Sequence, residues 1–426
     1  MHRRVTGMLP DSARAWSNLG TALSAAGRRE EAIAAILHAI SFESHEPELH
    51  YNLGNALLEA GDPATAEAAF LRVLGRAPDH VGALTNLGCA LKDQGRLAEA
   101  EAILRGAIAL APDNADLRWN LALALLAAGS YAEGWAFYEV RRAVHGFSIR
   151  PQKMPAWDGS PLCGRRLLVH AEQGLGDTLQ FCRYLIGLRA LGGEIVFEAP
   201  ARLVPLLRSL PADIPVTERA EGPLRCDLHV PLLSLPHLLG PAAPFWPDSG
   251  PYISPEPARA ARWAERLAGH AGLTVAIGWQ GNAVYRNDAA RSVPLAAFSP
   301  LASLPGLRLV SLQQGHGAEQ IDAVPWRDGL LHLGEEIDRD GAFLDTAAIL
   351  AHVDLVITSD TALAHLAGAM GVPIWLALAH VPDWRWGLAG AATPWYPAMR
   401  LFRQPARGDW RSVFDAMVRA IAELPA

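Results

Sequence analysis

The chain has 426 residues, of which 50% are hydrophobic and 19% are charged. At roughly 150 residues per domain, this length predicts two or three domains and excludes a small scaffold held together by disulfides or metal ions. The formal net charge of −7 does not indicate binding to nucleic acid or to anionic lipid, which are themselves negatively charged. Because no apolar run approaches the roughly 18 residues of a membrane span, the composition predicts a soluble globular protein without a transmembrane segment.

The N-terminus and the cysteines bear on the expected cellular location and on whether a structural metal site is expected. The first residues include basic side chains but no apolar stretch long enough for a signal peptide, so the cytoplasm is the expected location. The four cysteines lie far apart, with neither a C-x-x-C pair nor an adjoining histidine cluster. No structural metal site is therefore expected.

A spacing of 34 residues recurs in the first third of the chain. A Leu-Gly pair ends at Gly20, Gly54 and Gly88, and Leu121 continues the series with Ala122 in place of glycine. Each unit is expected to form a helix, a turn and a second helix, with the turns at Gly27, Gly61, Gly95 and Gly129. The segments NLGTALSAAGRREEAIAAI, NLGNALLEAGDPATAEAAF and NLGCALKDQGRLAEAEAIL resemble the tetratricopeptide repeat. Four units are expected over residues 10–145.

One polar position recurs in all four repeats. The residue before each of these leucines is an asparagine: Asn18, Asn52, Asn86 and Asn120. Helix packing does not require asparagine there, and a column of amides can pair with the backbone of an extended peptide. The column resembles the asparagine ladder of protein O-GlcNAc transferases, which implies a peptide or protein partner. Two alternatives remain open: duplication copied a neutral residue, or each asparagine bonds the neighbouring repeat.

After a Pro- and Gly-containing linker over residues 146–164, the pattern changes. Short apolar runs alternate with amphipathic helices, which predicts parallel sheets covered on both faces. The expected strands lie near residues 165–170, 194–200, 226–233, 273–279, 307–313, 354–360 and 373–379. A proline-rich stretch at 241–257 divides them into an N-terminal subdomain over 165–245 and a C-terminal one over 255–426. Two Rossmann-like subdomains facing a cleft are expected.

In the first subdomain, the segment AEQGLGDT follows the first strand. Gly174 and Gly176 permit a tight turn with close approach of a ligand, and Asp177 is expected at the helix N-cap. A carboxylate at the mouth of an interdomain cleft can act as a general base toward an acceptor hydroxyl. The alternative is that Asp177 only caps its helix.

In the second subdomain, ITSDTALAHLAGAMG places Asp360 at a strand end and Thr361 to Leu363 on the first helical turn. The backbone N–H groups of such a turn suit a diphosphate. Polar loops that follow two other strands are further candidates for contact with the compound that carries this diphosphate. Their candidate residues are Asn282, Arg286, Arg291 and Gln313. The aromatic side chains near the C-terminus either shape a sugar pocket or pack in the core or between the subdomains: Trp384, Trp386, Trp395 and Tyr396.

Residues 165–426 resemble a family 9, heptosyltransferase-type glycosyltransferase of GT-B fold, through GLGD in one half and SDTALAH in the other. The resemblance implies that Asp177 is the base, and it implies donor contacts at Asp360, Thr361, Ala362, Leu363 and His365. Ala362 stands where the family's usual D-T-G-x-x-H has glycine, and Arg286 or Arg291 stands where lysine is common. The combination of this domain with tetratricopeptide repeats in one chain resembles the domain organisation of bacterial proteins assigned as protein glycosyltransferases, including flagellin-modifying ones.

The expected fold is an α-helical tetratricopeptide solenoid followed by an α/β GT-B fold. The leading functional hypothesis is a metal-independent inverting glycosyltransferase that uses a nucleotide sugar as substrate and needs no cofactor. A protein held by the repeats is the acceptor that this hypothesis favours. The alternative is a noncatalytic repeat adaptor with a degenerate GT-B domain.

Overall fold

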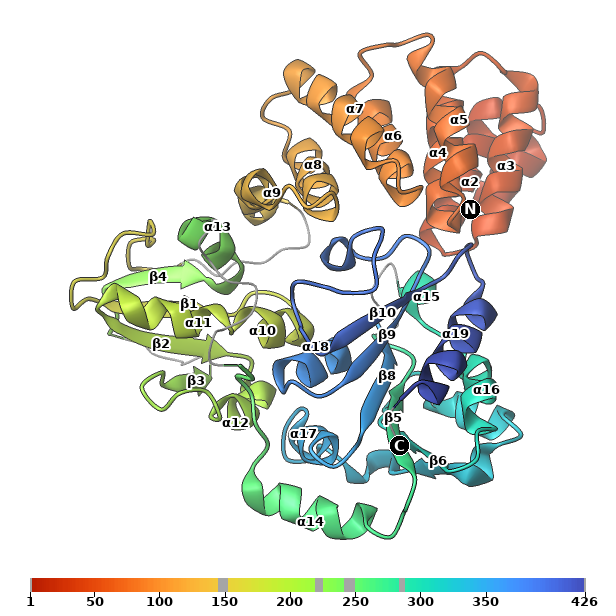
Figure 1. The fold of residues 1–426 in the computed structure, drawn as a ribbon. Helices are drawn as coiled ribbons and strands as arrows, with labels where there is room; N and C mark the ends of the chain where they lie inside the picture. Colours follow the sequence, from red (N-terminus) through yellow and green to blue (C-terminus); the bar gives the residue numbers. More distant parts are fainter. Residues whose placement is uncertain (1, 145–151, 219–224, 241–249, 283–287, 425–426) are drawn as a thin grey trace. The chain divides into compact units, whose positions relative to one another are not determined.

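The computed structural model describes residues 2–144, 152–218, 225–240, 250–282 and 288–424. The chain divides into two compact units, Met1–Gly146 and Phe147–Ala426. In the described residues the first unit is helical and the second is α/β (Figure 1). The linker expected at 146–164 and the proline-rich stretch expected at 241–257 lie partly outside the described residues.

In its described residues, the first unit contains α1 (His2–Met8), which the repeat pattern does not predict, four helix pairs and a 3₁₀ helix, Glu139–Ala143. The pairs are α2 (Ala13–Ala25) with α3 (Arg29–Phe42), α4 (Pro47–Ala60) with α5 (Pro63–Leu74), α6 (Val81–Asp93) with α7 (Leu97–Leu110), and α8 (Ala115–Ala127) with α9 (Tyr131–Tyr138). Glycine stands at each turn because the backbone there is left-handed, with φ of 74°, 83°, 77° and 79° at Gly27, Gly61, Gly95 and Gly129.

The glycines that define the repeat allow the two helices of a pair to pack closely. A Cβ atom added to Gly54 would lie 2.5 Å from Cε1 of Phe70, and one added to Gly88 would lie 2.6 Å from Cγ of Leu104. Both large side chains are fully buried. The recurring glycine and the large residue 16 positions later therefore form one interlocking contact in each of these repeats.

The second unit contains two sheets whose strand pairs are all parallel. The smaller has the order β3-β2-β1-β4 and the larger has the order β10-β9-β8-β5-β6-β7. The strands are β1 (Arg166–His170), β2 (Glu194–Ala199), β3 (Val216–Glu218), β4 (Leu228–Pro231), β5 (Leu273–Gly278), β6 (Leu307–Ser311), β7 (Leu330–His332), β8 (Leu355–Ser359), β9 (Ile374–Leu378) and β10 (Met399–Arg403).

The larger sheet is buried on both faces, as its nearly continuous apolar strands require. On one face, Val275, Ile277 and Ile357 pack with Phe298, Phe414 and other apolar side chains around α16 (Ser299–Ala302) and α19 (Trp410–Ala422). The intervening residues Ala276 and Val356 are buried as well, and α18 (Ala362–Ala369) contacts β8 and β9. The helices of the smaller sheet include α10 (Leu175–Phe181), α11 (Tyr184–Leu188), α12 (Val204–Leu207) and α13 (Leu235–Leu239).

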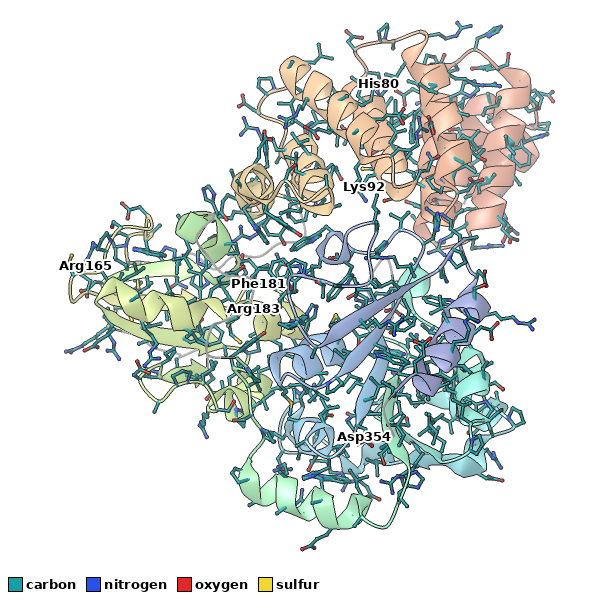
Figure 2. All side chains as sticks on the ribbon, in the orientation of Figure 1. His80, Lys92, Arg165, Phe181, Arg183 and Asp354 are labelled. Carbon is teal, nitrogen blue, oxygen red and sulfur yellow. The ribbon has the colours of Figure 1, made fainter. Side chains whose placement is uncertain are left out.

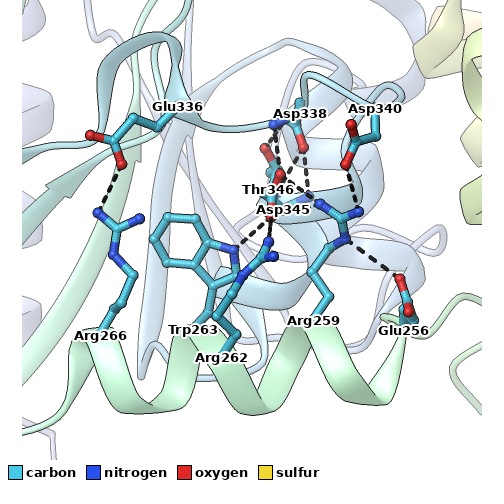
Figure 3. Close-up of polar contacts among 10 residues, drawn as sticks. All are labelled: Glu256, Arg259, Arg262, Trp263, Arg266, Glu336, Asp338, Asp340, Asp345 and Thr346. Carbon is cyan, nitrogen blue, oxygen red and sulfur yellow. Dashed lines mark hydrogen bonds and ion pairs between the residues drawn. The ribbon is translucent and has the colours of Figure 1, made fainter.

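A buried ionic network attaches α14 (Pro257–Leu267) to α17 (Leu344–Leu350) (Figure 3). The Asp345 carboxylate accepts hydrogen bonds from Arg259 Nη1, Arg262 Nη2 and Trp263 Nε1 at 2.8–2.9 Å. It also accepts one from the backbone N–H of Asp338 at 2.9 Å. This carboxylate therefore secures the helix that follows the connection between the two sheets.

The segment before β1 extends the smaller sheet at its edge. The backbone N–H of Trp157 donates to the carbonyl of His229 at 2.8 Å, and the N–H of His229 donates to the carbonyl of Pro155 at 3.0 Å. Ala156 forms a parallel bridge with the same residue. Residues 155–157 thus cover the outer side of β4, although the sequence assigns them to a linker.

The expected fold class is confirmed: helical repeats precede two parallel sheets in an arrangement consistent with a GT-B fold. All seven expected strands are present, whereas β3, β7, β10 and α14 were not expected. Among the described helices, none is both long enough and apolar enough to cross a membrane.

Candidate active site

Each sheet contains one point at which the strand order reverses. In the smaller sheet this point lies between β1 and β4, and in the larger sheet it lies between β5 and β8. Open α/β sheets bind ligands beyond the carboxyl ends of strands at such a point. Gly174 to Asp177 follow β1, and Asp360 and Thr361 follow β8, so both principal segments from the sequence stand near these positions.

The Asp177 carboxylate bonds both the start of its own helix and an arginine of the other subdomain. The N-cap of α10 is Gly174, not Asp177 as the sequence suggested, because Asp177 lies three residues inside the helix. Its Oδ2 accepts the backbone N–H of Gly174 at 3.1 Å, and its Oδ1 accepts a hydrogen bond from Arg385 Nη2. Burial raises the pKa of Asp177, although the charge of Arg385 opposes that rise.

The helix α18 begins at the end of β8 as the sequence suggests. Thr361 is the N-cap residue in an extended conformation, and its hydroxyl forms no capping hydrogen bond. The first-turn N–H groups at Ala362 and Leu363 have no partner within the helix, as at any helix start. Burial and the nearby carboxylate of Asp383 raise the pKa of Asp360 to about 6, against the opposing charges of Arg291 and Arg385.

His365 lies one turn into α18 and is buried. Its Nδ1 shares a hydrogen bond with the Tyr396 hydroxyl at 2.9 Å, and its ring stacks on Trp386 with a centroid distance of 5.6 Å. Burial, together with the charges of Arg385, Arg183 and Arg291, holds the pKa of His365 well below its usual value. The imidazole is therefore neutral at physiological pH.

The Asp177 loop and α18 come into direct contact. A Cβ atom added to Gly176 would lie 3.1 Å from His365 Cδ2 and 3.4 Å from the Cα of Ala362. The helices α10 and α18 pack against each other. The structure thus brings the expected base, the expected anion-binding turn and the two loop glycines together, and Ala362 faces the position where Gly176 has no side chain.

The remaining donor candidates differ in their surroundings. Arg291 Nε donates to Asp288 Oδ1 at 3.2 Å, and a Cβ atom added to Gly281 would lie 2.6 Å from Arg291 Nη2. Asn282 is exposed, and Arg286 lies outside the described residues.

Gln313 is buried and bonds to two loops. Its Oε1 accepts the N–H groups of Trp279 and Gln280 at 3.0 Å, and its Nε2 donates to the His316 carbonyl at 2.7 Å. It therefore holds together the loops that follow β5 and β6.

Local sequence patterns did not identify two arginines that join the two subdomains, Arg183 and Arg385. Arg183, labelled with Phe181 in Figure 2, donates to the Trp395 carbonyl at 2.6 Å and to the Tyr252 hydroxyl at 2.9 Å. Arg385 joins α10 to the segment after β9. The only sequence signal for either residue was an arginine within an apolar or aromatic run. The aromatic residues around Arg385 are buried, which matches the alternative that they pack in the core or between the subdomains: Trp384, Trp386, Trp395 and Tyr396.

In the first unit, the asparagine column bonds neighbouring repeats. Asn52 Nδ2 donates to Ser17 Oγ at 3.1 Å, and Asn86 Nδ2 donates to Asn55 Oδ1 at 2.7 Å. Asn120 Oδ1 accepts the thiol hydrogen bond of Cys89. Asn18, in the first repeat, is exposed. These contacts favour the alternative that the amides connect repeats, and the side-chain oxygens can still accept further hydrogen bonds.

No group of three or more His, Cys, Asp or Glu side chains in the described segments is placed to hold a metal ion.

Comparison with known proteins finds relatives for the repeats and for more of the chain. The tetratricopeptide repeat family matches residues 17–81, 51–115 and 85–143. Protein FlbA of Caulobacter vibrioides is 31% identical over 316 residues, which cover 69% of this chain and 52% of that protein. The chain therefore spans about half the length of this curated relative. Because the match is longer than the first unit, it extends into the second.

Solved structures with similar folds match about a third of the chain. PilW, titled a type IV pilus biogenesis factor, is 21% identical with a TM-score of 0.32, and the match covers 33% of this chain and 66% of PilW. MamA from Desulfovibrio magneticus RS-1 is 26% identical with a TM-score of 0.29, covering 31% and 74%. The family match and the four helix pairs together identify residues 17–143 as tetratricopeptide repeats, a repeat type that typically binds peptides or proteins.

Proposed function

We propose that the second unit is an inverting glycosyltransferase, which moves a sugar from a nucleotide diphosphate donor to an acceptor hydroxyl. The observation that supports this proposal most directly is the contact between the Asp177 loop and α18. Gly176 approaches that helix so closely that an added Cβ atom would lie 3.1 Å from His365 Cδ2. A partly buried carboxylate and the start of a helix, which attracts anions, therefore lie side by side near the carboxyl ends of both sheets.

In the proposed reaction, Asp177 accepts the proton of the acceptor hydroxyl while the acceptor oxygen attacks the anomeric carbon. The bond between that carbon and the phosphate oxygen breaks, and its electron pair leaves with the nucleotide diphosphate. Because attack is opposite to the departing group, the configuration inverts. A carboxylate whose pKa is raised by burial is a stronger base than an exposed one.

The negative charge that develops on the leaving diphosphate needs fixed positive partners. The first-turn N–H groups of α18 are oriented before the reaction, so they stabilise the developing charge without reorganisation. Arg291 lies near enough to lower the pKa of Asp360 through its charge. In this proposal the chain's own groups neutralise the leaving group, and the nucleotide sugar enters as a substrate rather than as a cofactor.

We further propose that the repeats hold the acceptor as a protein or peptide. Tetratricopeptide repeats typically bind such partners. The amides at Asn18, Asn52, Asn86 and Asn120 lie at one repeat position and retain capacity to bond a backbone after connecting the repeats.

A thermal-shift screen tests the donor assignment. The purified chain is heated with UDP-, GDP-, ADP-, CMP- and dTDP-linked sugars, and a ligand that binds the native state raises the melting temperature. We expect one nucleotide class to stabilise the protein and to be hydrolysed slowly. Stabilisation without hydrolysis or transfer would favour the noncatalytic adaptor, and no stabilisation by any member would contradict the donor site.

Thr361→Asp gives a sharper test of the anion-binding turn. Aspartate caps helices at least as well as threonine, so the melting temperature should not fall. The added carboxylate would compete for the same N–H groups and repel a diphosphate, so nucleotide affinity measured by calorimetry should fall by about tenfold or more. Ser130→Asp, at the N-cap of α9, is the matched control and should leave affinity unchanged. Unchanged binding by the Thr361 variant would place the diphosphate elsewhere.

The asparagine column allows stability and recognition to be separated. Asn86→Ala removes two inter-repeat hydrogen bonds, to Asn55 and Tyr51, and should lower the free energy of unfolding by about 1–2 kcal/mol in urea titrations. Asn18→Ala, at an exposed site in the first repeat, should change that free energy by less than about 0.5 kcal/mol. If the column binds the acceptor, Asn18→Ala should still reduce acceptor modification while donor hydrolysis continues at the wild-type rate. Normal modification by this variant would argue that the repeats recognise their partner through another surface.

A further inference from the structure

The guanidinium of Arg385 holds a central place between the two subdomains. It extends from the 3₁₀ turn Trp384–Trp386, which follows β9. Its Nε donates to Gln180 Oε1 at 2.6 Å, its Nη1 donates to Asp383 Oδ1 at 2.8 Å, and its Nη2 donates to Asp177 Oδ1. All three nitrogens are therefore engaged, and two of the three partners belong to α10.

The surroundings of Arg385 favour one firmly held cation. The side chain is 10% exposed, and its guanidinium lies 4.3 Å from the ring centroid of Trp384. The Trp395 indole donates to the Arg385 carbonyl at 3.0 Å, which fixes the backbone. A long side chain on a fixed backbone can exchange hydrogen-bond partners without rearranging the fold.

This pairing conflicts with the role proposed for Asp177. A carboxylate that shares a charge-assisted hydrogen bond with arginine is a weaker base, because its ionised form is stabilised. An incoming diphosphate is a stronger competitor for the guanidinium than a single carboxylate, because arginine binds phosphate oxygens with two parallel N–H groups and the diphosphate has the larger charge. The next residue, Trp386, stacks on His365 of α18, so Arg385 lies close to the proposed diphosphate position.

We propose that Arg385 is a positioning residue that exchanges partners: it pairs with Asp177 in the free protein and with the donor diphosphate in the complex. This inference rests on the proposed function and deepens it. Donor binding then releases the base, so a proton is abstracted only when a donor is in place. The acceptor hydroxyl is therefore deprotonated only after the donor has bound. Without a donor, Asp177 does not take up a proton from water or from an acceptor bound alone.

The exchange makes an unusual prediction for binding. Removing the charge of Asp177 removes the competitor for Arg385, so Asp177→Asn should bind a diphosphate about three- to tenfold more tightly than the wild type, the scale of one released hydrogen bond. Arg385→Gln should bind it more weakly. In the double variant the gain from Asp177→Asn should vanish, because no guanidinium remains to be released.

The experiment is calorimetric titration of the full chain and these three variants with UDP, GDP, ADP, dTDP and inorganic pyrophosphate. Arg403→Gln is the matched control, because Arg403 stabilises the segment that carries Arg385. Arg403 donates to the backbone carbonyls of Trp386, Gly387 and Gly390. This control should not show coupling to Asp177→Asn. Melting temperatures report whether each variant is folded, and Arg385→Lys retains a charge if the glutamine variant unfolds.

The outcomes separate the two proposals. Tighter binding by Asp177→Asn that disappears without Arg385 supports the exchange. If the wild type binds a nucleoside diphosphate but Asp177→Asn shows no gain, the exchange is wrong and the glycosyltransferase proposal stands. If no nucleoside diphosphate and no pyrophosphate binds, both are wrong. Equal losses in the Arg385 and Arg403 variants, with no coupling to Asp177, would reduce Arg385 to a support of the segment.

Discussion

Asp177→Asn should reduce sugar transfer by about 10²- to 10⁴-fold, the usual contribution of a general base. The fold should survive, because the side-chain oxygen of asparagine can still accept the Gly174 N–H. Arg385 would keep the Asp383 carboxylate as a charged partner. Transfer is measured with the donor found in the thermal-shift screen, and the melting temperature is recorded in parallel.

An aspartate that caps another helix of the same unit provides the control. Asp409 accepts the Ser412 N–H at 3.0 Å at the start of α19 and stands at no proposed site. Asp409→Asn should leave both transfer and melting temperature nearly unchanged. Full turnover by the Asp177 variant would reduce Asp177 to a structural residue that bonds the Gly174 N–H and Arg385.

Asp345→Ala should give the largest loss of stability, about 3–5 kcal/mol in the free energy of unfolding, because it removes one partner of a buried ion pair. The carboxylate is 5% exposed and accepts hydrogen bonds from two arginines, a tryptophan and a backbone N–H (Figure 3). The measurement is chemical denaturation followed by tryptophan fluorescence. Asp340→Ala is the control, because Asp340 is 72% exposed and bonds only the outer side of Arg259; its loss should stay below about 1 kcal/mol.

The same residue predicts a pH dependence. Burial tends to raise the pKa of Asp345, but the hydrogen bonds from Trp263 and Arg259 outweigh burial and lower it. A carboxyl with a lowered pKa in the folded state stabilises the fold above its unfolded pKa of about 3.9, and this contribution is lost as the pH falls through the folded value. The wild type should therefore lose more stability than Asp345→Ala on acidification below about pH 4. Parallel acid curves for the two proteins would contradict this assignment.

The parts of the fold that follow local patterns could be predicted. The spacing of Gly20, Gly54 and Gly88 located the helix pairs because each glycine meets a large residue of its own repeat. The long apolar strands were also recognisable. The strands β3 and β7 have three residues each, too few for a periodic signal, and β10 carries arginines at Arg400 and Arg403, which obscured it.

The site was predictable only in part, because its essential contacts join distant residues. Asp177 and the start of α18 were found from turn and helix signals that lie within a few residues. Arg385 pairs with Asp177 across 208 positions, and no local pattern reports such a contact. For Gln313 the sequence indicated the position after a strand but not the role of the side chain. Its amide bonds two loops, which only the three-dimensional arrangement reveals.

The pairing of residues 155–157 with β4 covers one edge of the smaller sheet. An uncovered edge strand offers unpaired N–H and C=O groups to other molecules, and natural sheets commonly protect such edges. Here the chain entering the unit supplies that protection through Trp157 and Pro155. A fragment that begins at residue 165, where the sequence pattern starts its first strand, leaves the β4 edge open to intermolecular pairing and aggregation. A fragment that begins ahead of Pro155 retains its cover.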